Sequence, residues 1–352
     1  MILKSPMFLE CTLRDGSYVI DFQFTVESTE SIGSALDLAG FPYIEVGHGI
    51  GLGASDLGQH VAAASDIEYM QAAAGSIQHN KWGMFCIPGI AKLDHVRMAA
   101  DHGMDFIRIG TEVSKVESSE PFINLARELG IEVFSNFMKS YVVTPEEFGR
   151  LTTLAAGMGS QLVYLVDSAG GMLPSEIRSY IRAARAEAPG FPLGFHGHNN
   201  LGLSVANSLV CAEEGVEIVD TSLQGFGRSS GNTPTEQLIG ALIRAGYTLP
   251  YDPLKVMSLG ESLIRPLIEQ RGLSSLDTAS GLALFHSSYM PTVLKMAKRH
   301  RVDPRALILE LCKHDNINAP EDLLDQLAIE LKASNAAPKV LPWSNYYGEE
   351  QR

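Results

Sequence analysis

Three residues in this sequence have the types and the spacing of a divalent-metal site. His196 and His198 are separated by one residue, inside an apolar run that is typical of a strand. Alternate side chains of a strand point the same way, so both imidazoles can face one ion. Asp15 follows another strand-like run and would add a carboxylate oxygen. A mixed nitrogen and oxygen site suits a divalent cation and leaves positions for substrate. In the His-x-His pair alone, one histidine could equally be structural, and Asp15 is what favours the metal.

The elements that must position these residues alternate between strands and helices. We predict strands at residues 8–13, 43–46, 82–87, 106–109, 132–137, 162–167, 193–196 and 218–222. We predict helices between them at residues 28–39, 60–74, 92–102, 121–129, 145–156, 174–188 and 204–214. Near-continuous apolar strands that alternate with helices predict a parallel (β/α)8 barrel. A doubly wound open sheet fits less well, because the eight strand–helix units follow one another without a long connection between them.

The alternating pattern fades after about Tyr247, and the rest of the chain is helical. We predict helices there at residues 254–267, 281–300, 304–312 and 319–331. A barrel takes roughly 250 residues, which leaves about a hundred for a second unit. The predicted organisation is a TIM barrel over 1–250, a helical C-terminal domain over 251–335 and a loose tail over 336–352.

Composition excludes several kinds of partner. The formal net charge of −14 argues against nucleic acid and against anionic membrane surfaces. The most apolar stretch, 151–173, is interrupted by polar residues, so we expect no membrane span. The 4 cysteines are scattered, match no zinc spacing and indicate a reducing, cytoplasmic setting. The N-terminus has no long apolar run, so we expect no signal peptide.

In such a barrel the chemistry lies where strands end and the following loops begin. Polar clusters follow the first, seventh and eighth predicted strands, at residues 12–17, 195–200 and 225–232. Glu45 ends the second predicted strand, and Ser168 follows the sixth. We expect Glu45 to hydrogen-bond a site group, or to be a buried ion-pair partner that orients its neighbours. We expect Ser168 to hydrogen-bond the substrate, or to cap the next helix.

These motifs resemble the metal-dependent (β/α)8 superfamily that includes 3-hydroxy-3-methylglutaryl-CoA lyase and isopropylmalate synthase. The likeness is strongest to its 4-hydroxy-2-oxovalerate aldolases. It rests on Thr-Leu-Arg-Asp-Gly at 12–16, Ile-Glu-Val-Gly-His-Gly at 44–49, His-Gly-His-Asn at 196–199 and Gly-Asn at 231–232. Further matches in the C-terminal helices extend the likeness over almost the whole chain.

The resemblance implies a ligand set and a chemistry. Asp15, His196 and His198 would bind the metal, with Asn232 coordinating or supporting it. Arg14 would face the carbonyl and enolate oxygen of a 2-oxo acid, which chelates the ion through its carboxylate and ketone. The alternative for Arg14 is a salt bridge that closes the barrel end. The family leads us to expect Mn²⁺ or Mg²⁺, although the ligands also fit Co²⁺ or Zn²⁺.

Two positions depart from the aldolase pattern. The aldolases have a histidine in Arg-Asp-Gly-Ser-His that takes the hydroxyl proton, and this chain has Tyr18 there. A tyrosine pKa of about 10 makes a poor base at neutral pH, although the phenol can donate. A C-terminal stretch that carries an aldolase tyrosine has His286 instead. We hypothesise that His286 is the base and Tyr18 its partner; otherwise His286 is only a helix residue. His48 is a third candidate base and a candidate for substrate binding, with a different loop role as its alternative.

Three functions follow from these residues. The first is a class II metal-dependent aldolase, a carbon–carbon lyase that acts on a 4-hydroxy-2-oxo acid through a pyruvate enolate. The second is a Claisen-type acyl-CoA condensing enzyme or acyl-CoA lyase. It is weakened because loop 225–232 lacks the cysteine that 3-hydroxy-3-methylglutaryl-CoA lyase has there. The third is a barrel that has lost catalysis, against which the clustered polar groups argue.

The expected partners are a small 2-oxo acid and an aldehyde. Related aldolases pair through their C-terminal domain with an acylating aldehyde dehydrogenase. The resemblance therefore leaves a dehydrogenase partner open, and composition leaves a homo-oligomer open. The changed residues near His286 leave bulkier aldehydes equally open.

Overall fold

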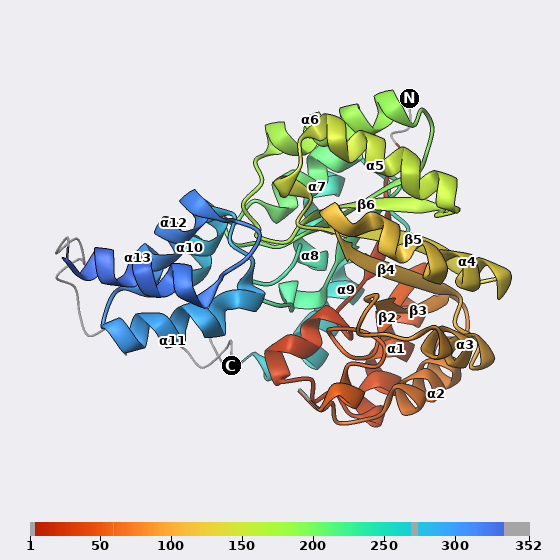
Figure 1. Cartoon of the computed structure of the whole chain (residues 1–352). Helices are drawn as coiled ribbons and strands as arrows, with labels where there is room; N and C mark the ends of the chain where they lie inside the picture. Colours follow the sequence, from red (N-terminus) through yellow and green to blue (C-terminus); the bar gives the residue numbers. More distant parts are fainter. Residues whose placement is uncertain (1–3, 59, 269–273, 334–352) are drawn as a thin grey trace.

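The computed structural model describes residues 4–58, 60–268 and 274–333, and its centre is a closed parallel barrel. Neighbouring strands follow in sequence order, and the last pairs with the first. The strands are β1 (Met7–Glu10), β2 (Tyr43–Val46), β3 (Lys81–Cys86), β4 (Phe106–Glu112), β5 (Glu132–Met138), β6 (Leu162–Asp167), β7 (Leu193–Gly197) and β8 (Ile218–Thr221). The predicted (β/α)8 barrel is confirmed, with helices arranged around it (Figure 1).

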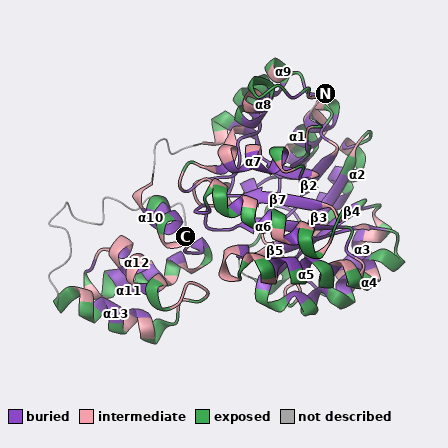
Figure 2. Ribbon diagram, turned by 90° about the horizontal axis from the view of Figure 1, so that it is seen from above, coloured by how far each residue is buried: buried purple, intermediate pink, exposed green. Residues whose placement is uncertain are grey.

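A helix follows each strand and covers the barrel from outside. These helices are α1 (Val26–Ala39), α2 (Asp66–Ser76), α3 (Leu93–Asp101), α4 (Glu120–Glu128), α5 (Pro145–Met158), α6 (Pro174–Glu187), α7 (Ser204–Glu213) and α8 (Thr235–Arg244). Figure 2 shows buried strands at the centre and exposed helix surfaces outside. The sequence pattern places the start of α2 at residue 60. The structure has it at Asp66, because Ser65 and Glu68 form a capping box there.

Side chains fill the barrel interior. The rings of Tyr43, Phe106 and Phe134 pack against one another inside the barrel, with centroids 5.3 to 5.6 Å apart. A packed interior of this kind holds the strands in a fixed register. Residues that follow the strand ends are therefore held in defined positions around one opening.

The helices after the barrel belong to two hydrophobic clusters. Helix α9 (Pro253–Leu259) packs on the barrel, and Val256 and Ile264 belong to the main hydrophobic cluster. A second cluster starts at Leu276. It is built by α10 (Ser275–Ala283), α11 (Met290–His300), α12 (Pro304–His314) and α13 (Glu321–Ala333). Residues up to Ile268 therefore pack with the barrel cluster, and Figure 1 shows α10 to α13 beside the barrel; the domain boundary at residue 250 stays a prediction. The predicted tail, 336–352, lies outside the described residues.

The single helix predicted over 281–300 is wrong. Helix α10 ends at Ala283, Leu284 has a left-handed backbone with φ 53°, and α11 starts only at Met290. A proline in the first turn of α11 suits a helix start and not a helix interior. The break gives residues 284–289 an irregular path. Among the described residues, no helix is long and apolar enough to cross a membrane.

Candidate metal centre and active site

The predicted metal ligands lie together where the barrel strands end. Asp15 follows β1, His196 lies in β7, and His198 follows β7 directly. Each side chain is buried and offers one ligand atom, and these atoms lie within 4.8 Å of one another. Strands β1 and β7 both flank β8, so barrel closure brings together residues that are far apart in sequence.

Hydrogen bonds orient both imidazoles. Nδ1 of His196 lies 2.7 Å from Oδ2 of Asp220, and Nδ1 of His198 lies 3.3 Å from the carbonyl oxygen of Gly231. Because a carboxylate and a carbonyl can only accept, Nδ1 of each ring is the donor, and Nε2 is the nitrogen that remains to face a cation. Metal-binding histidines are commonly held in this way by a group behind the ring.

Asn232 lies beside His198, with which it forms an isolated β-bridge. Its Nδ2 donates to Sγ of Cys11 at 3.6 Å, whereas its Oδ1 is buried without a hydrogen-bond partner. An unpartnered buried oxygen is unfavourable unless a donor or a cation meets it. Together with one carboxylate and two imidazoles, this amide oxygen makes a donor set that fits a divalent ion.

The charges around the ligands favour the protonation states that bind metal. Burial alone would raise the pKa of Asp15, but Arg14 and the histidines outweigh it and hold that pKa well below its usual range. Burial, followed by the charge of Arg228, lowers the pKa of His198 to about 3. At neutral pH Asp15 is therefore an anion and His198 a neutral imidazole, the forms that bind a cation.

Arg14 is held between two carboxylates. Its Nη1 donates to Asp15 at 2.6 Å and its Nε donates to Glu45 at 2.7 Å. Neither of these two carboxylates accepts from Nη2. The ring of Phe85 packs on the guanidinium, with 4.8 Å between Cζ and the ring centroid. The ion pair expected at the barrel end is present, and it also fixes Arg14 beside the predicted metal ligand Asp15.

Two charged residues that no sequence motif singles out extend this network. Arg108 in β4 donates through Nη1 to Glu45 at 3.0 Å, and its Nη2 lies 2.7 Å from Asp220. Asp220 in turn is the carboxylate behind His196. Buried charges of this kind are stable only when paired. The sequence held a signal for both, since an arginine in Phe-Ile-Arg-Ile and an aspartate in Ile-Val-Asp-Thr interrupt apolar strands.

A second group of ligand atoms, from Cys11, His196 and Asp220, lies within the same reach. In this group Asp220 is already hydrogen-bonded to His196 and ion-paired with Arg108. The Cys11 thiol donates to the Thr221 carbonyl oxygen at 3.2 Å, and burial raises the pKa of Cys11 well above its usual value. A thiolate ligand is therefore disfavoured, and the group that contains Asp15 is the better candidate.

Tyr18 lies in the short turn Asp15–Ile20 at the edge of the site. Burial raises the pKa of Tyr18, against an opposing effect of the Arg228 charge. A Cβ on Gly49 would meet the Tyr18 ring at 2.7 Å, so only glycine allows this close approach. A phenol that stays protonated at neutral pH can donate a hydrogen bond but is a poor base.

His286 lies in the break between α10 and α11, so the alternative of a plain helix residue is wrong. Its Nε2 lies 3.4 Å from Arg228 Nη2, and its Nδ1 lies 2.6 Å from Ser288 Oγ and 3.2 Å from the Ser288 backbone nitrogen. Burial, then Arg228 and Lys139, hold the pKa of His286 well below its usual value, so the ring is neutral at pH 7. Arg228 favours a lone pair on Nε2, whereas the Ser288 N–H favours one on Nδ1. The ring can therefore hold its proton on either nitrogen.

Ser168 is engaged with the backbone. Its Oγ accepts a hydrogen bond from the Lys139 N–H at 3.0 Å. The expected alternative of a helix cap is wrong, because α6 begins at Pro174, with Leu173 as its N-cap residue. A substrate contact by Ser168 stays a prediction.

His48 is engaged in a similar way. Its Nε2 lies 2.7 Å from the His60 carbonyl oxygen, and its Nδ1 accepts from the Ile50 N–H at 3.1 Å. The ring also stacks on Phe22, with 4.2 Å between centroids. These contacts favour the loop role, and a substrate contact by His48 stays a prediction.

Arg228 is a site residue that the motif pattern missed. Its backbone N–H donates to Oδ2 of Asp15 at 3.3 Å, and its Nη2 lies 3.3 Å from Nε2 of His198. The signal for it was present, because Arg228 is the only charged residue in the loop 225–232.

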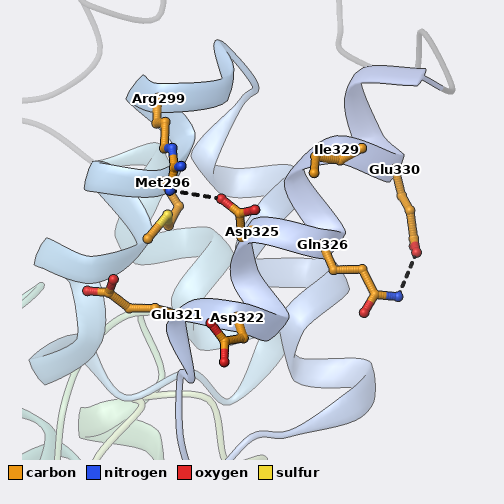
Figure 3. A pocket seen from close by; sticks show the side chains of 8 residues that line it. All are labelled: Met296, Arg299, Glu321, Asp322, Asp325, Gln326, Ile329 and Glu330. Carbon is orange, nitrogen blue, oxygen red and sulfur yellow. Dashed lines mark hydrogen bonds and ion pairs between the residues drawn. The ribbon is translucent and has the colours of Figure 1, made fainter.

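A hollow of about 580 Å³ lies apart from this site, on the C-terminal helices (Figure 3). It is lined by Met296, Arg299, Glu321, Asp322, Asp325, Gln326, Ile329 and Glu330. Arg299 pairs with Asp325 at 3.1 Å across it. None of the lining residues carries a buried unpartnered polar atom. The clustered ligands and perturbed pKa values lie at the barrel mouth, and the candidate chemistry belongs there.

Known proteins resemble this chain in sequence. The HMGL-like family model matches residues 5–263. A 4-hydroxy-2-oxovalerate aldolase of Carboxydothermus hydrogenoformans is 34% identical, over 94% of this chain and 99% of its own length. A protein of the same name from Geobacillus thermodenitrificans is 36% identical, over 93% of this chain and 96% of its own length.

Solved structures share the fold at lower identity. HMG-CoA lyase from Brucella melitensis superposes with a TM-score of 0.66 at 19% identity, covering 76% of this chain and 100% of that one. The carboxyl transferase domain of Rhizobium etli pyruvate carboxylase has a TM-score of 0.75 at 15% identity, covering 94% of this chain and 61% of that one. Because the family match spans every strand of the barrel and the curated relatives match nearly the whole chain, this chain belongs to the HMGL-like family.

Proposed function

We propose that this chain is a class II, divalent-metal-dependent aldolase that forms and cleaves the carbon–carbon bond of a 4-hydroxy-2-oxo acid through a pyruvate enolate. The observation that carries this proposal is the cluster of Asp15, His196 and His198 beside the clamped guanidinium of Arg14. The relatives named 4-hydroxy-2-oxovalerate aldolases support the same reaction.

The ligand cluster is proposed to hold the metal and, through it, the 2-oxo acid. A divalent ion held by Asp15, His196 and His198 would supply Lewis-acid polarisation of the ketone. Asn232 supports the same position with its unpartnered Oδ1. On family grounds Mn²⁺ or Mg²⁺ is the proposed ion, with Co²⁺ and Zn²⁺ as competitors for these ligands.

Arg14 is proposed to stabilise the enolate oxygen. Asp15 and Glu45 hold two of its nitrogens, which leaves Nη2 to donate toward the substrate. Negative charge develops on the ketone oxygen as the carbon–carbon bond breaks, and a fixed guanidinium favours that charge. Because the ion pairs fix Arg14 before substrate binds, little reorganisation accompanies the reaction.

His286 and Tyr18 are proposed to handle the proton of the C4 hydroxyl. In cleavage, Nε2 of neutral His286 accepts that proton as the bond between C3 and C4 breaks. Throughout this step Nδ1 keeps its proton and donates a hydrogen bond to Ser288 Oγ, 2.6 Å away. Burial keeps Tyr18 protonated, so it donates a hydrogen bond to the same oxygen. In the addition direction His286 returns the proton to the new alkoxide.

Partner and location are further proposals. The helical unit α10–α13 is the proposed docking site for an acylating aldehyde dehydrogenase, on the resemblance to the aldolases alone. A homo-oligomer is compatible with the same chain. A cytoplasmic location is supported by free cysteines at positions 11, 86, 211 and 312.

The test is exchange of the methyl protons of pyruvate in deuterium oxide, followed by proton NMR. Metal-loaded protein is expected to exchange them and chelator-treated protein is not. Asp15→Asn should lose exchange, whereas Asp94→Asn, which changes an exposed aspartate of α3, should keep it. No exchange together with turnover of an acyl-CoA would favour the acyl-CoA enzyme and contradict the proposal.

A further inference from the structure

Arg228 places a guanidinium between the metal ligands and the C-terminal unit. Its Nη1 donates to Ser287 Oγ at 2.8 Å. Its Nη2 lies 3.3 Å from Nε2 of His198 and 3.4 Å from Nε2 of His286. None of the three partners is an anion, because two are imidazoles and the third is a hydroxyl. None of these contacts pairs the guanidinium with a carboxylate, although its charge is near enough to Asp15 to contribute to the lowered pKa of that residue.

The neighbouring cations differ from Arg228 in this respect. Arg14, Arg108 and Lys139 each form an ion pair with at least one buried or half-buried carboxylate. Across residues 4–58, 60–268 and 274–333, no carboxylate oxygen lies within ion-pair distance of the Arg228 guanidinium. Of the Arg228 nitrogens, only the backbone N–H donates to Asp15, whose other oxygen accepts from Arg14.

Metal binding would remove one of the present contacts. Nε2 of His198 is the atom proposed to bind the ion, and it cannot at the same time accept from Arg228. The guanidinium is half-buried, in a protein with a formal net charge of −14. A partly desolvated guanidinium without a carboxylate partner binds an anion strongly, and its fork geometry matches carboxylate or phosphate.

The neighbours of Arg228 indicate which part of the substrate it meets. Its Cζ lies 5.8 Å from the Tyr18 ring centroid, and His286 lies on the same guanidinium. These are the residues proposed to act on the C4 hydroxyl, and every atom beyond C4 comes from the aldehyde. Ser287 accepts from Arg228 and so keeps its own hydroxyl proton for a second hydrogen bond.

We propose that Arg228, with Ser287, binds an anionic group, either a carboxylate or a phosphate, on the aldehyde half of the substrate. This inference rests on the proposed aldolase function and narrows it to aldehydes with a negatively charged end. A neutral aldehyde would leave the guanidinium desolvated and unmatched, so the residue selects by charge.

The test compares charged and neutral aldehydes of similar length in aldol addition to pyruvate. 4-Oxobutanoate is paired with butanal, and glycolaldehyde phosphate with glycolaldehyde, which separates the two anion types. Wild type is expected to favour the charged member of one pair by about 10- to 100-fold in kcat/KM, the range for a charge-assisted hydrogen bond. Arg228→Gln should bring the charged-to-neutral ratio of kcat/KM to about 1, and Arg228→Lys should retain part of the preference. Arg299→Gln, which removes an exposed arginine from α11, is the matched control and should leave the ratio unchanged.

Binding without turnover provides a second readout. 2-Oxoheptanedioate lacks the C4 hydroxyl and cannot be cleaved, and 2-oxoheptanoate is its counterpart with a neutral end. Calorimetry on metal-loaded wild type should show the diacid binding about 10- to 100-fold tighter. Arg228→Gln should bind both compounds with similar affinity.

Two results would overturn the inference: no preference for a charged aldehyde in wild type, or a charged-to-neutral ratio that Arg228→Gln leaves unchanged. Failure of the proposed aldolase function is distinguishable from either. In that case wild type would not exchange the methyl protons of pyruvate, whichever aldehyde is supplied.

Discussion

Asp220 lies directly behind a proposed metal ligand, with its Oδ2 2.7 Å from Nδ1 of His196. Both side chains are buried, and Arg108 holds the carboxylate from the other side at 2.7 Å. This contact fixes the tautomer of His196 and makes its Nε2 a stronger donor to a metal. The proposed metal centre would therefore depend on a strand residue that lies behind a ligand.

Asp220→Asn is expected to weaken metal binding by about 10- to 100-fold, because an amide holds the imidazole less firmly than a carboxylate. Titration calorimetry with Mn²⁺ measures this directly. Asp94→Asn, at an exposed position, is the control and should bind like wild type. An unchanged affinity in Asp220→Asn would show that His196 needs no carboxylate behind it.

Arg14→Lys is expected to lower kcat by about 100- to 1,000-fold, the loss typical for one donor to a developing oxyanion. Lysine keeps the charge but cannot span Asp15 and Glu45 while donating to substrate. Metal affinity should change little, because Asp15 remains. If kcat and Mn²⁺ affinity fell together, Arg14 would act only by holding Asp15.

His286→Ala is expected to lower kcat by about 100- to 10,000-fold, as for loss of a general base, with metal affinity retained. His300→Ala in α11, whose imidazole pairs with Asp325, is the matched control and should leave kcat unchanged. Activity unaffected by His286→Ala would end the idea that the acid–base role has moved there.

The pH dependence offers a separate check on His286. Because its pKa is held well below the usual value of 6.5, the neutral base persists as the pH falls below 6.5. The kcat profile of wild type should therefore show no loss of a base near pH 6.5. A clear fall in kcat with a midpoint near that pH would contradict the assignment.

Much of the fold and part of the site follow from local sequence. Eight apolar runs separated by helical segments predict the barrel, and the His-x-His spacing places two ligands on one strand face. The buried chain from Glu45 through Arg108 to Asp220 is different. Its members lie in strands β2, β4 and β8, and only closure of the barrel brings them together.

The helix break in the C-terminal region is a second feature that local sequence does not predict. Leu284 adopts a left-handed backbone that leucine rarely takes, so its sequence gives no sign of a helix end. That break places His286 beside Arg228. Likewise, Val256 and Ile264 look like part of a helical domain, but their packing partners are in the barrel. Long-range packing decides both outcomes.

Stability should depend on pH through Glu10. Burial raises the pKa of Glu10 from 4.5 to about 7, despite hydrogen bonds from Thr12. The folded protein therefore binds this proton more tightly than the unfolded chain does. The resulting stabilisation of the folded state is complete below about pH 4.5 and is lost as the pH rises to about 7. Between pH 4.5 and pH 7, the melting temperature of wild type should fall relative to that of Glu10→Gln. Glu128→Gln changes an exposed position, so its melting temperature should vary with pH as that of wild type does. If the curve of Glu10→Gln also ran parallel to that of wild type, the raised pKa of Glu10 would be contradicted.

The most direct measurement is a Mn²⁺ titration, followed by the electron paramagnetic resonance signal of the free ion. Two ligand groups share His196, so Asp15→Asn and Cys11→Ser distinguish them. We predict a tight site in wild type that is lost in Asp15→Asn and in His198→Ala, and kept in Cys11→Ser. Loss of the site in Cys11→Ser, with Asp15→Asn and His198→Ala binding like wild type, would contradict the metal centre proposed here.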